Sequence, residues 1–229
     1  MSIIYLLEIH RDDKSVSSLS NEQVSKLVSS LTKLPGLSGL LMFIQAEGGH
    51  DPVLKDENPP LLVFQALFND KESLHKALSS SEFEDPREQL LALSANGIRV
   101  LQEAMLFEPY LSSATENGLA DLSYLVNYQR PAENETEFLQ YYRAHHPAIL
   151  KEFPDIRRVE LGTPIDWKSA AGIERADRML YCEVSFDNIE KLNVALDSEK
   201  RKELRKDYDC FPPFSGEVTH FPMHRKVII

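Results

Sequence analysis

The stretch FDNIEKLNVALDS, residues 186–198, repeats the pattern of an earlier stretch, FNDKESLHKALSS, residues 68–80. Both begin with Phe and carry an Ala-Leu pair at the same place near the end. A second pair of stretches, LTKLPGLSGLLMF (31–43) and LKEFPDIRRVELG (150–162), aligns on a proline that breaks a helix, at nearly the same offset. Self-similarity at a fixed period indicates that the architecture is duplicated.

Each half of the chain shows the same order of elements: strand, helix, strand, strand, helix, strand. Apolar runs predict strands at 3–10, 37–47, 61–68 and 99–110, and again at 122–130, 156–165, 178–186 and 216–229. Helical periodicity predicts helices at 20–34, 71–80 and 86–96, and again at 133–153, 188–198 and 199–207. This order is the ferredoxin-like split βαβ pattern.

We therefore expect an α+β protein of two tandem ferredoxin-like (βαββαβ) halves, residues 1–110 and 122–229, joined by a polar linker at 111–121. Helices that cover one face of an antiparallel sheet leave the other face bare, and that face must be buried. Because the linker keeps the second sheet close, we predict that the two sheets pack into one intramolecular barrel. Such a chain is a monomer with an internal pseudo-dimer, and a further homodimer stays open.

The composition excludes several partners. A formal net charge of −11 argues against a nucleic acid or an anionic membrane as the main partner. The longest apolar runs fall short of the roughly 18 residues of a membrane span, and the first one is too short for a signal peptide. The two cysteines and the histidines show no zinc-site spacing. We expect a cytoplasmic protein with reduced thiols and no bound metal.

The helix at 133–153 carries the first candidate site residue. Phe138, Tyr142 and His146 recur at helical spacing on the face that should meet the sheet, whereas His145 lies nearer the edge. A neutral imidazole in an apolar cleft can take or give a proton near pH 7. The alternative, which stays open, is a core histidine bonded to a backbone carbonyl.

Strand alternation suggests further pocket residues. Tyr128 and Arg130 share one face of the 122–130 strand, and Tyr181 and Glu183 share one face of the 178–186 strand. A buried Glu183 could pair with an imidazole or with Arg130. The pattern alone favours plainer interpretations, a half-buried aromatic for Tyr128 and an exposed strand face for Glu183. The charge run at 199–207, EKRKELRKD, is typical of a solvated helix face.

The second half resembles the EthD (ethyl tert-butyl ether degradation) family of the dimeric α/β barrel superfamily, most clearly in EFLQYYRAHHPAILKEFPDIRRVEL, residues 137–161. The family shows Phe, an aromatic region, His followed by Pro and apolar residues, and then Pro-Gly before a strand. The positions that match here are Phe138, Tyr142, His146, Pro147, Ile149 and Pro154. This chain departs from the family at Tyr142, where Trp is common, and at Asp155, where Gly follows the Pro.

The resemblance implies the barrel fold and a broad set of activities. The superfamily includes cofactor-free monooxygenases on polyketide aromatics, lactone isomerases, dehydratases, decarboxylases and haem-dependent enzymes, and fold analogy cannot choose among them. In the first half, the position that corresponds to His146 is Leu27, and no histidine stands near it. The first half is therefore expected to be a degenerate copy, with one full pocket in the second half.

Three hypotheses follow for function. The first is an enzyme without cofactor that acts on a small hydrophobic, aromatic or cyclic metabolite, with His146 as acid and base and with Tyr142 and Tyr128 orienting the substrate. The second is a binding or accessory protein that holds such a ligand unchanged. The third is haem binding through His146, which ranks last because only Arg143 offers a nearby basic group for propionates. No nucleotide-binding or nucleophile motif is present.

Overall fold

The computed structural model describes residues 2–11, 18–49, 51, 58–112 and 120–229. Within these residues the strands are β1 (Ser2–Arg11), β2 (Leu37–Gln45), β3 (Leu62–Phe68), β4 (Ile98–Ser112), β5 (Leu122–Gln129), β6 (Arg158–Pro164), β7 (Glu174–Arg175), β8 (Arg178–Phe186) and β9 (Val218–Val227). The α-helices are α1 (Asn21–Leu31), α2 (Lys71–Leu78), α3 (Glu84–Ser94), α4 (Glu135–Leu150), α5 (Ile189–Leu196) and α6 (Glu199–Tyr208).

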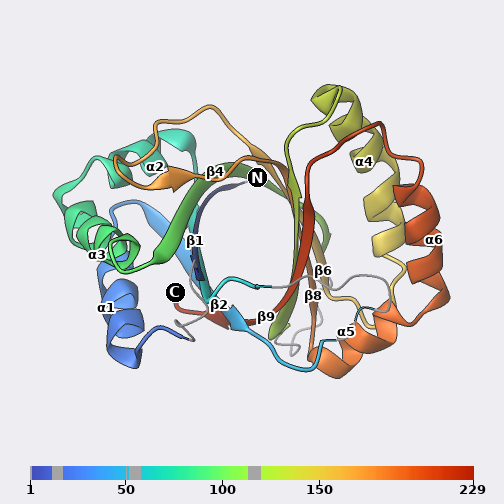
Figure 1. Ribbon diagram of the computed structural model, residues 1–229, viewed down its shortest axis with the longest axis horizontal. Coiled ribbons are helices and arrows are strands. Elements are labelled where there is room, and N and C mark those ends of the chain that lie inside the picture. The colour runs from blue at the N-terminus through green and yellow to red at the C-terminus, as the bar shows by residue number, and fades with distance from the viewer. Residues whose placement is uncertain (1, 12–17, 50, 52–57, 113–119) are drawn as a thin grey trace.

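Eight of the described strands close into an antiparallel barrel, which Figure 1 shows end-on. The order is β1-β3-β2-β9-β5-β8-β6-β4, and β4 returns to pair with β1. The two halves of the chain meet at β2–β9 and at β4–β6, both antiparallel pairings. The predicted α+β intramolecular barrel is thus confirmed. The short β7 runs parallel to β4 outside the ring.

The two repeated stretches form the same strand-to-helix connection. Asp70 caps α2 by accepting a hydrogen bond from the backbone N–H of Ser73, and Asn188 caps α5 by accepting one from Lys191. The matching Leu and Ala side chains of both helices are buried against the sheet, namely Leu74, Ala77, Leu192 and Ala195. The similar residues of the two stretches therefore specify a helix N-cap and the helix face that packs against the sheet.

The departure from the family at Asp155 has a backbone consequence. Asp155 has a φ of 57°, in the left-handed region, and its counterpart Gly36 has a φ of 74°. Both residues follow the proline that ends a helix. Aspartate tolerates this conformation better than most side chains do, and its carboxylate accepts a hydrogen bond from Lys191 Nζ at 3.0 Å. The turn is kept although its glycine is not.

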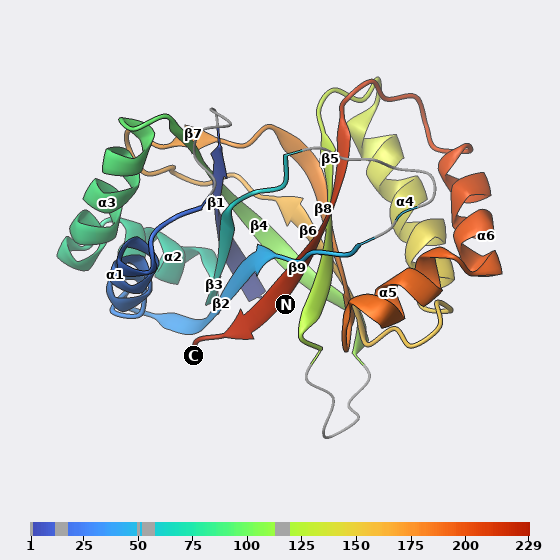
Figure 2. The ribbon, with the colours of Figure 1, turned by 60° about the horizontal axis from the view of Figure 1, so that its bottom comes forward.

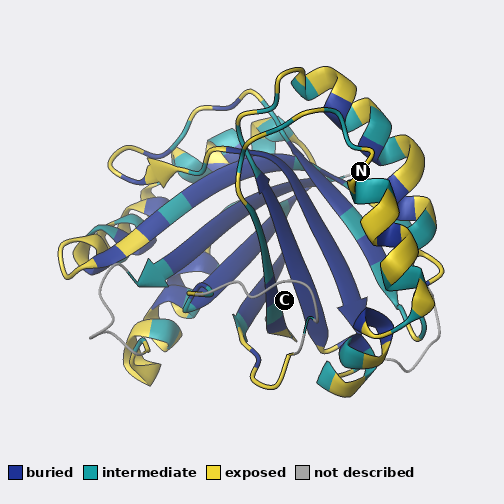
Figure 3. Cartoon of the chain, turned by 45° about the vertical axis from the view of Figure 1, so that its right-hand side comes forward, coloured by how far each residue is buried: buried dark blue, intermediate teal, exposed yellow. Residues whose placement is uncertain are grey.

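The helices cover the outside of the barrel in two groups, so the molecule has three apolar regions. Figure 2 shows α1, α2 and α3 on one side and α4, α5 and α6 on the other. Each group packs on the outer face of its own four strands, and a third cluster, drawn from both halves, fills the interior of the barrel. In Figure 3 the strands are buried almost throughout, whereas the helices expose their outer faces.

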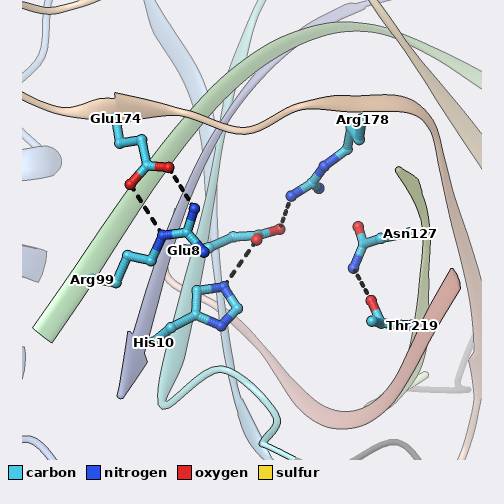
Figure 4. A network of polar contacts seen from close by, with 7 residues as sticks. All are labelled: Glu8, His10, Arg99, Asn127, Glu174, Arg178 and Thr219. Carbon is cyan, nitrogen blue, oxygen red and sulfur yellow. Dashed lines mark hydrogen bonds and ion pairs between the residues drawn. The ribbon is translucent and has the colours of Figure 1, made fainter. Parts of the chain in front are cut away.

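A buried ion pair joins the halves inside the barrel, as Figure 4 shows. Arg178 Nη2 in β8 lies 2.7 Å from Glu8 Oε1 in β1, and only 1% of the Arg178 side chain is exposed. His10 Nε2 lies 3.1 Å from the other oxygen of Glu8. Burial alone would raise the pKa of Glu8, but Arg178 and His10 outweigh that effect and lower it to about 2. The carboxylate is therefore ionised at neutral pH.

Most of the predicted linker at 111–121 lies outside the described residues. Its first two residues belong to β4, which continues to Ser112 to pair with β6. Among the described residues, no helix combines the length and apolarity needed to cross a bilayer.

Removal of one partner of the buried pair should destabilise the barrel strongly. Arg178→Gln leaves the Glu8 carboxylate buried without its counter-charge, and we expect the free energy of unfolding in urea to fall by about 3–5 kcal/mol. Arg99→Gln is the matched control, because Arg99 pairs with Glu174 at the surface with half of its side chain exposed. That variant should lose at most about 1 kcal/mol. Equal losses in the two variants would contradict this account of the interior.

Candidate functional site

Helix α4 turns one aromatic face toward the sheet. Asn134 caps it by accepting a hydrogen bond from the backbone N–H of Glu137. Phe138, Tyr142 and His146 are buried on the inner face, as their spacing predicts. His145 is exposed and stacks on Tyr141, with ring centroids 4.4 Å apart. Of the adjacent histidines, the second alone faces the interior.

His146 is held by a carboxylate from α6. Its Nδ1 lies 2.7 Å from Asp207 Oδ2, and the exposed fractions of the two side chains are 6% and 8%. A carboxylate can only accept a hydrogen bond, so Nδ1–H donates and Nε2 keeps its lone pair. Burial lowers the pKa of His146, and the opposing effect of Asp207 does not restore it to the ordinary value of 6.5. The imidazole is therefore neutral and basic at Nε2 near pH 7.

The partner of His146 lies in the charge run that the sequence assigns to solvent. That interpretation is wrong for one face of α6: Arg201, Leu204 and Asp207 are largely buried against α4 and the sheet. Charged residues occur on all sides of the helix, so hydrophobic periodicity does not reveal which face is buried. The available signal is the helical spacing of Arg201, Leu204 and Tyr208, which form a mixed but continuous stripe.

A cavity of about 190 Å³ lies between the outer face of the second half's sheet and helices α4, α5 and α6. Tyr128 and Tyr142, whose rings meet edge to face at 5.4 Å, form part of its aromatic wall beside His146. Burial raises the pKa of both phenols well above the ordinary value, so both stay protonated. Cys182 also lines the cavity, and burial raises the pKa of its thiol to about 12, which leaves it unreactive as a nucleophile.

Arg201 also lines the cavity and is paired with a residue from the first half. Arg201 Nη2 lies 3.2 Å from Asp51 Oδ2, and Tyr124 O–H donates to the same oxygen at 3.1 Å. His220 lies beside Tyr124, with ring centroids 5.7 Å apart. Asp51 follows β2 and contacts Arg201 and Tyr124, both of which line the cavity. No sequence pattern indicates this long-range contact.

The structure brings some of the predicted site residues together and separates others. Tyr128 and Tyr142 line the cavity with His146. Phe138 packs behind them, 5.7 Å from the Tyr128 ring and 6.3 Å from the Tyr142 ring. Arg130 lies at the end of β5, where it binds Glu135 and the backbone carbonyl of Arg178. Arg130 therefore links β5 to α4 and β8 near the surface.

Tyr181 and Glu183 lie inside the barrel, on the other side of the sheet from His146. The interpretation of Glu183 as part of an exposed strand face is wrong, because this residue is fully buried. Its carboxylate accepts hydrogen bonds from Ser123 Oγ at 2.7 Å and from Tyr181 O–H at 3.3 Å. Within the described part of the chain, its hydrogen-bond partners include neither an imidazole nor Arg130. Strand alternation correctly predicted that Tyr181 and Glu183 share a face of β8. It could not show that both faces of this strand are buried, one by the barrel interior and one by helices.

The first half carries no counterpart of the His146 site in its described part. Leu27, at the position that corresponds to His146, is buried among apolar side chains of the first helical group. A second cavity between α1 and α3, of about 170 Å³, is lined by amides, Lys26 and apolar groups. The acid–base pair therefore belongs to the second half.

Comparison with known structures shows the barrel fold. An anthrone oxidase-like protein is 16% identical over 99% of this chain and 93% of its own, with a TM-score of 0.60. A protein from Lactobacillus acidophilus NCFM with a provisional monooxygenase assignment is 12% identical over 99% and 96%, with a TM-score of 0.53. The expected resemblance to dimeric α/β barrel proteins is confirmed. At these identities the likeness extends to the fold alone.

An EthD family protein from Bacillus halodurans C-125 is also similar. It is 19% identical over 43% of this chain and 95% of its own, with a TM-score of 0.34, which is too low to carry an argument. Neither a family model nor a curated protein sequence matches the chain.

The ionisation of His146 gives a direct test of this geometry. We expect the ring protons of His146 to titrate below pH 6.5 by NMR, and to titrate lower still in Asp207→Asn, because the carboxylate favours the charged imidazole. An unfolded histidine binds its proton near pH 6.5, so the contribution of His146 to stability is present above that pH and is lost as the pH falls. A titration midpoint above 6.5 would contradict the expectation that burial outweighs Asp207 in setting this pKa.

Proposed function

We propose that this chain is a tandem pair of ferredoxin-like halves that works as a cofactor-independent enzyme. Its substrate would be a small cyclic or aromatic metabolite, and its chemistry would be proton transfer by His146. The observation that supports the proposal most directly is the buried His146–Asp207 pair in the wall of a cavity. Among the described residues, no three His, Cys, Asp or Glu side chains gather as a metal site requires. The proposal therefore assigns the chemistry to side chains.

The size of the cavity limits the substrate. A dry cavity of roughly 150 Å³ accepts benzene, and the cavity beside His146 measures about 190 Å³. Sites for drug-sized ligands span about 300–1,000 Å³. One ring with small substituents fits without rearrangement, whereas haem, which is larger than most drugs, does not. We therefore favour a monocyclic substrate and derive no step through haem.

The proposed reaction begins with removal of an acidic proton from the substrate. Nε2 of His146 takes the proton from a carbon next to a carbonyl group or from a phenol, and the electron pair moves onto the substrate oxygen. Asp207 holds the ring orientation and stabilises the imidazolium while it carries the proton. Return of the proton to a different carbon completes an isomerisation and needs no further reactant. Tyr128 and Tyr142 provide the aromatic wall on which the substrate ring rests.

Deuterium exchange tests the proposal without knowledge of the natural substrate. Monocyclic ketones and phenols are incubated with the protein in deuterated water, and the loss of their exchangeable C–H signals is followed by NMR. We expect the wild-type protein to accelerate exchange for those compounds that bind. His146→Gln should reduce the acceleration by about 10²–10⁴-fold. Asp207→Asn should also reduce the acceleration, because a carboxylate then no longer fixes the Nδ1–H tautomer of His146.

His145→Gln is the matched control, because His145 is the neighbouring histidine on the exposed side of α4. Its exchange rate should equal that of the wild type. If compounds bind and are recovered without exchange, the chain is a binding protein and the catalytic proposal is wrong. Failure of the whole panel to exchange would have the same meaning.

A further inference from the structure

One residue of the cavity wall, Arg201, belongs to an ion pair that the proposed proton transfer does not use. Arg201 and Asp51 pair at 3.2 Å, and the exposed fractions of their side chains are 11% and 6%. Withdrawal of two charges from water costs free energy that a single pair recovers only in part. An ordinary packing role would be met at lower cost by apolar side chains. Because Arg201 lines the cavity, its buried charge lies within reach of a ligand held there.

Arg201 and His146 act on the same space. Both line the cavity, and the positive charge of Arg201 is among the influences that lower the pKa of His146. They come from the facing elements α6 and α4. A substrate that gives its proton to His146 therefore has a fixed cation close to the group that becomes negative.

Resting on the proposed function, we propose that Arg201 is the oxyanion-binding residue of this site, and that Asp51 positions it. When the proton moves to Nε2 of His146, the negative charge develops on the enolate or phenolate oxygen of the substrate. A guanidinium N–H donates a charge-assisted hydrogen bond to that oxygen. The substrate class is accordingly a monocyclic phenol or cyclic ketone whose oxygen lies toward Arg201 and whose ring lies toward Tyr128 and Tyr142.

Asp51 has the geometry of a positioning residue. Its Oδ2 accepts hydrogen bonds from both Arg201 Nη2 and the Tyr124 hydroxyl. Tyr124 of β5 therefore holds the carboxylate that in turn holds the guanidinium. An arginine has five N–H donors, and the contact with Asp51 engages the Nη2 end. The first half has Leu27 at the position that corresponds to His146, so it has no imidazole of its own there. It contributes Asp51 to the site of the second half.

The affinity of a phenolate measures the oxyanion site without catalysis. The probe is 4-nitrophenol, followed by its absorbance at a pH where the free probe is largely ionised, and its methyl ether, 4-nitroanisole, is the uncharged reference. We expect the wild type to bind the phenolate more tightly than the ether, and to lower the apparent pKa of the bound phenol. Arg201→Gln should weaken phenolate binding by roughly 10- to 100-fold and change ether binding by less than about 3-fold.

Three variants make the assignment specific. Lys202→Gln is the matched control: Lys202 lies one residue further along α6 but is exposed, pairs with Glu199 and does not line the cavity, and its loss should change phenolate affinity by less than about 3-fold. Arg201→Lys should keep part of the preference for the phenolate over the ether, because the positive charge remains although the planar set of guanidinium N–H donors is lost. Asp51→Asn should weaken phenolate binding less than Arg201→Gln does, and the double variant should be no worse than Arg201→Gln alone.

The results separate this inference from the proposed function. Equal phenolate preference in the wild type and Arg201→Gln, or no preference in the wild type, would overturn the inference even if His146→Gln abolished deuterium exchange. A clear effect of Arg201 with no exchange by any variant would leave an anion-binding pocket and overturn the enzyme. Tighter phenolate binding in Asp51→Asn, or an additive loss in the double variant, would contradict the positioning role of Asp51.

Discussion

Closure of the barrel is the constraint on which the rest of the structure depends. Each half presents four strands, with helices on one face and nothing of its own to cover the other. The β2–β9 and β4–β6 pairings bring the two bare faces together and leave no long free edge. With both sheets committed to one interior, helices can lie only on the outside. The cavity in the second half lies between its sheet and helices α4, α5 and α6.

The position of the site explains why its parts come from distant segments. Helix α4 supplies the imidazole and Tyr142, α6 supplies the carboxylate partner and an arginine, and strand β5 supplies Tyr128. Because closure brings Asp51 next to β5 and α6, a carboxylate of the first half binds Arg201 in the wall of that cavity. The two halves are therefore unequal: the second half holds the His146–Asp207 pair, and the first half contributes Asp51, which binds Arg201. Burial lowers the pKa of the imidazole, so the ring is neutral at pH 7 and keeps a lone pair on Nε2.

The sequence predicted the barrel because its information is local and repeated. Caps, helix breaks and alternating strands recur in both halves, and a bare sheet face has few ways to be covered. The inward orientation of His146 followed from helical spacing in the same way. Asp207 was missed because charges surround α6, and Asp51 because only the closed fold brings it near. The interior location of Glu183 was missed because alternation distinguishes two faces without showing that both are buried.

The tautomer of His146 tests the central claim most directly. In protein labelled with nitrogen-15 at histidine, and at pH 7 without ligand, the account predicts a neutral ring with its proton on Nδ1, bonded to Asp207, and a free lone pair on Nε2. Substitution Asp207→Asn should broaden or shift that Nδ1 signal and leave the His145 signals in place. A ring protonated on Nε2, or on both nitrogens, at pH 7 would contradict the account, because no base would then face the cavity.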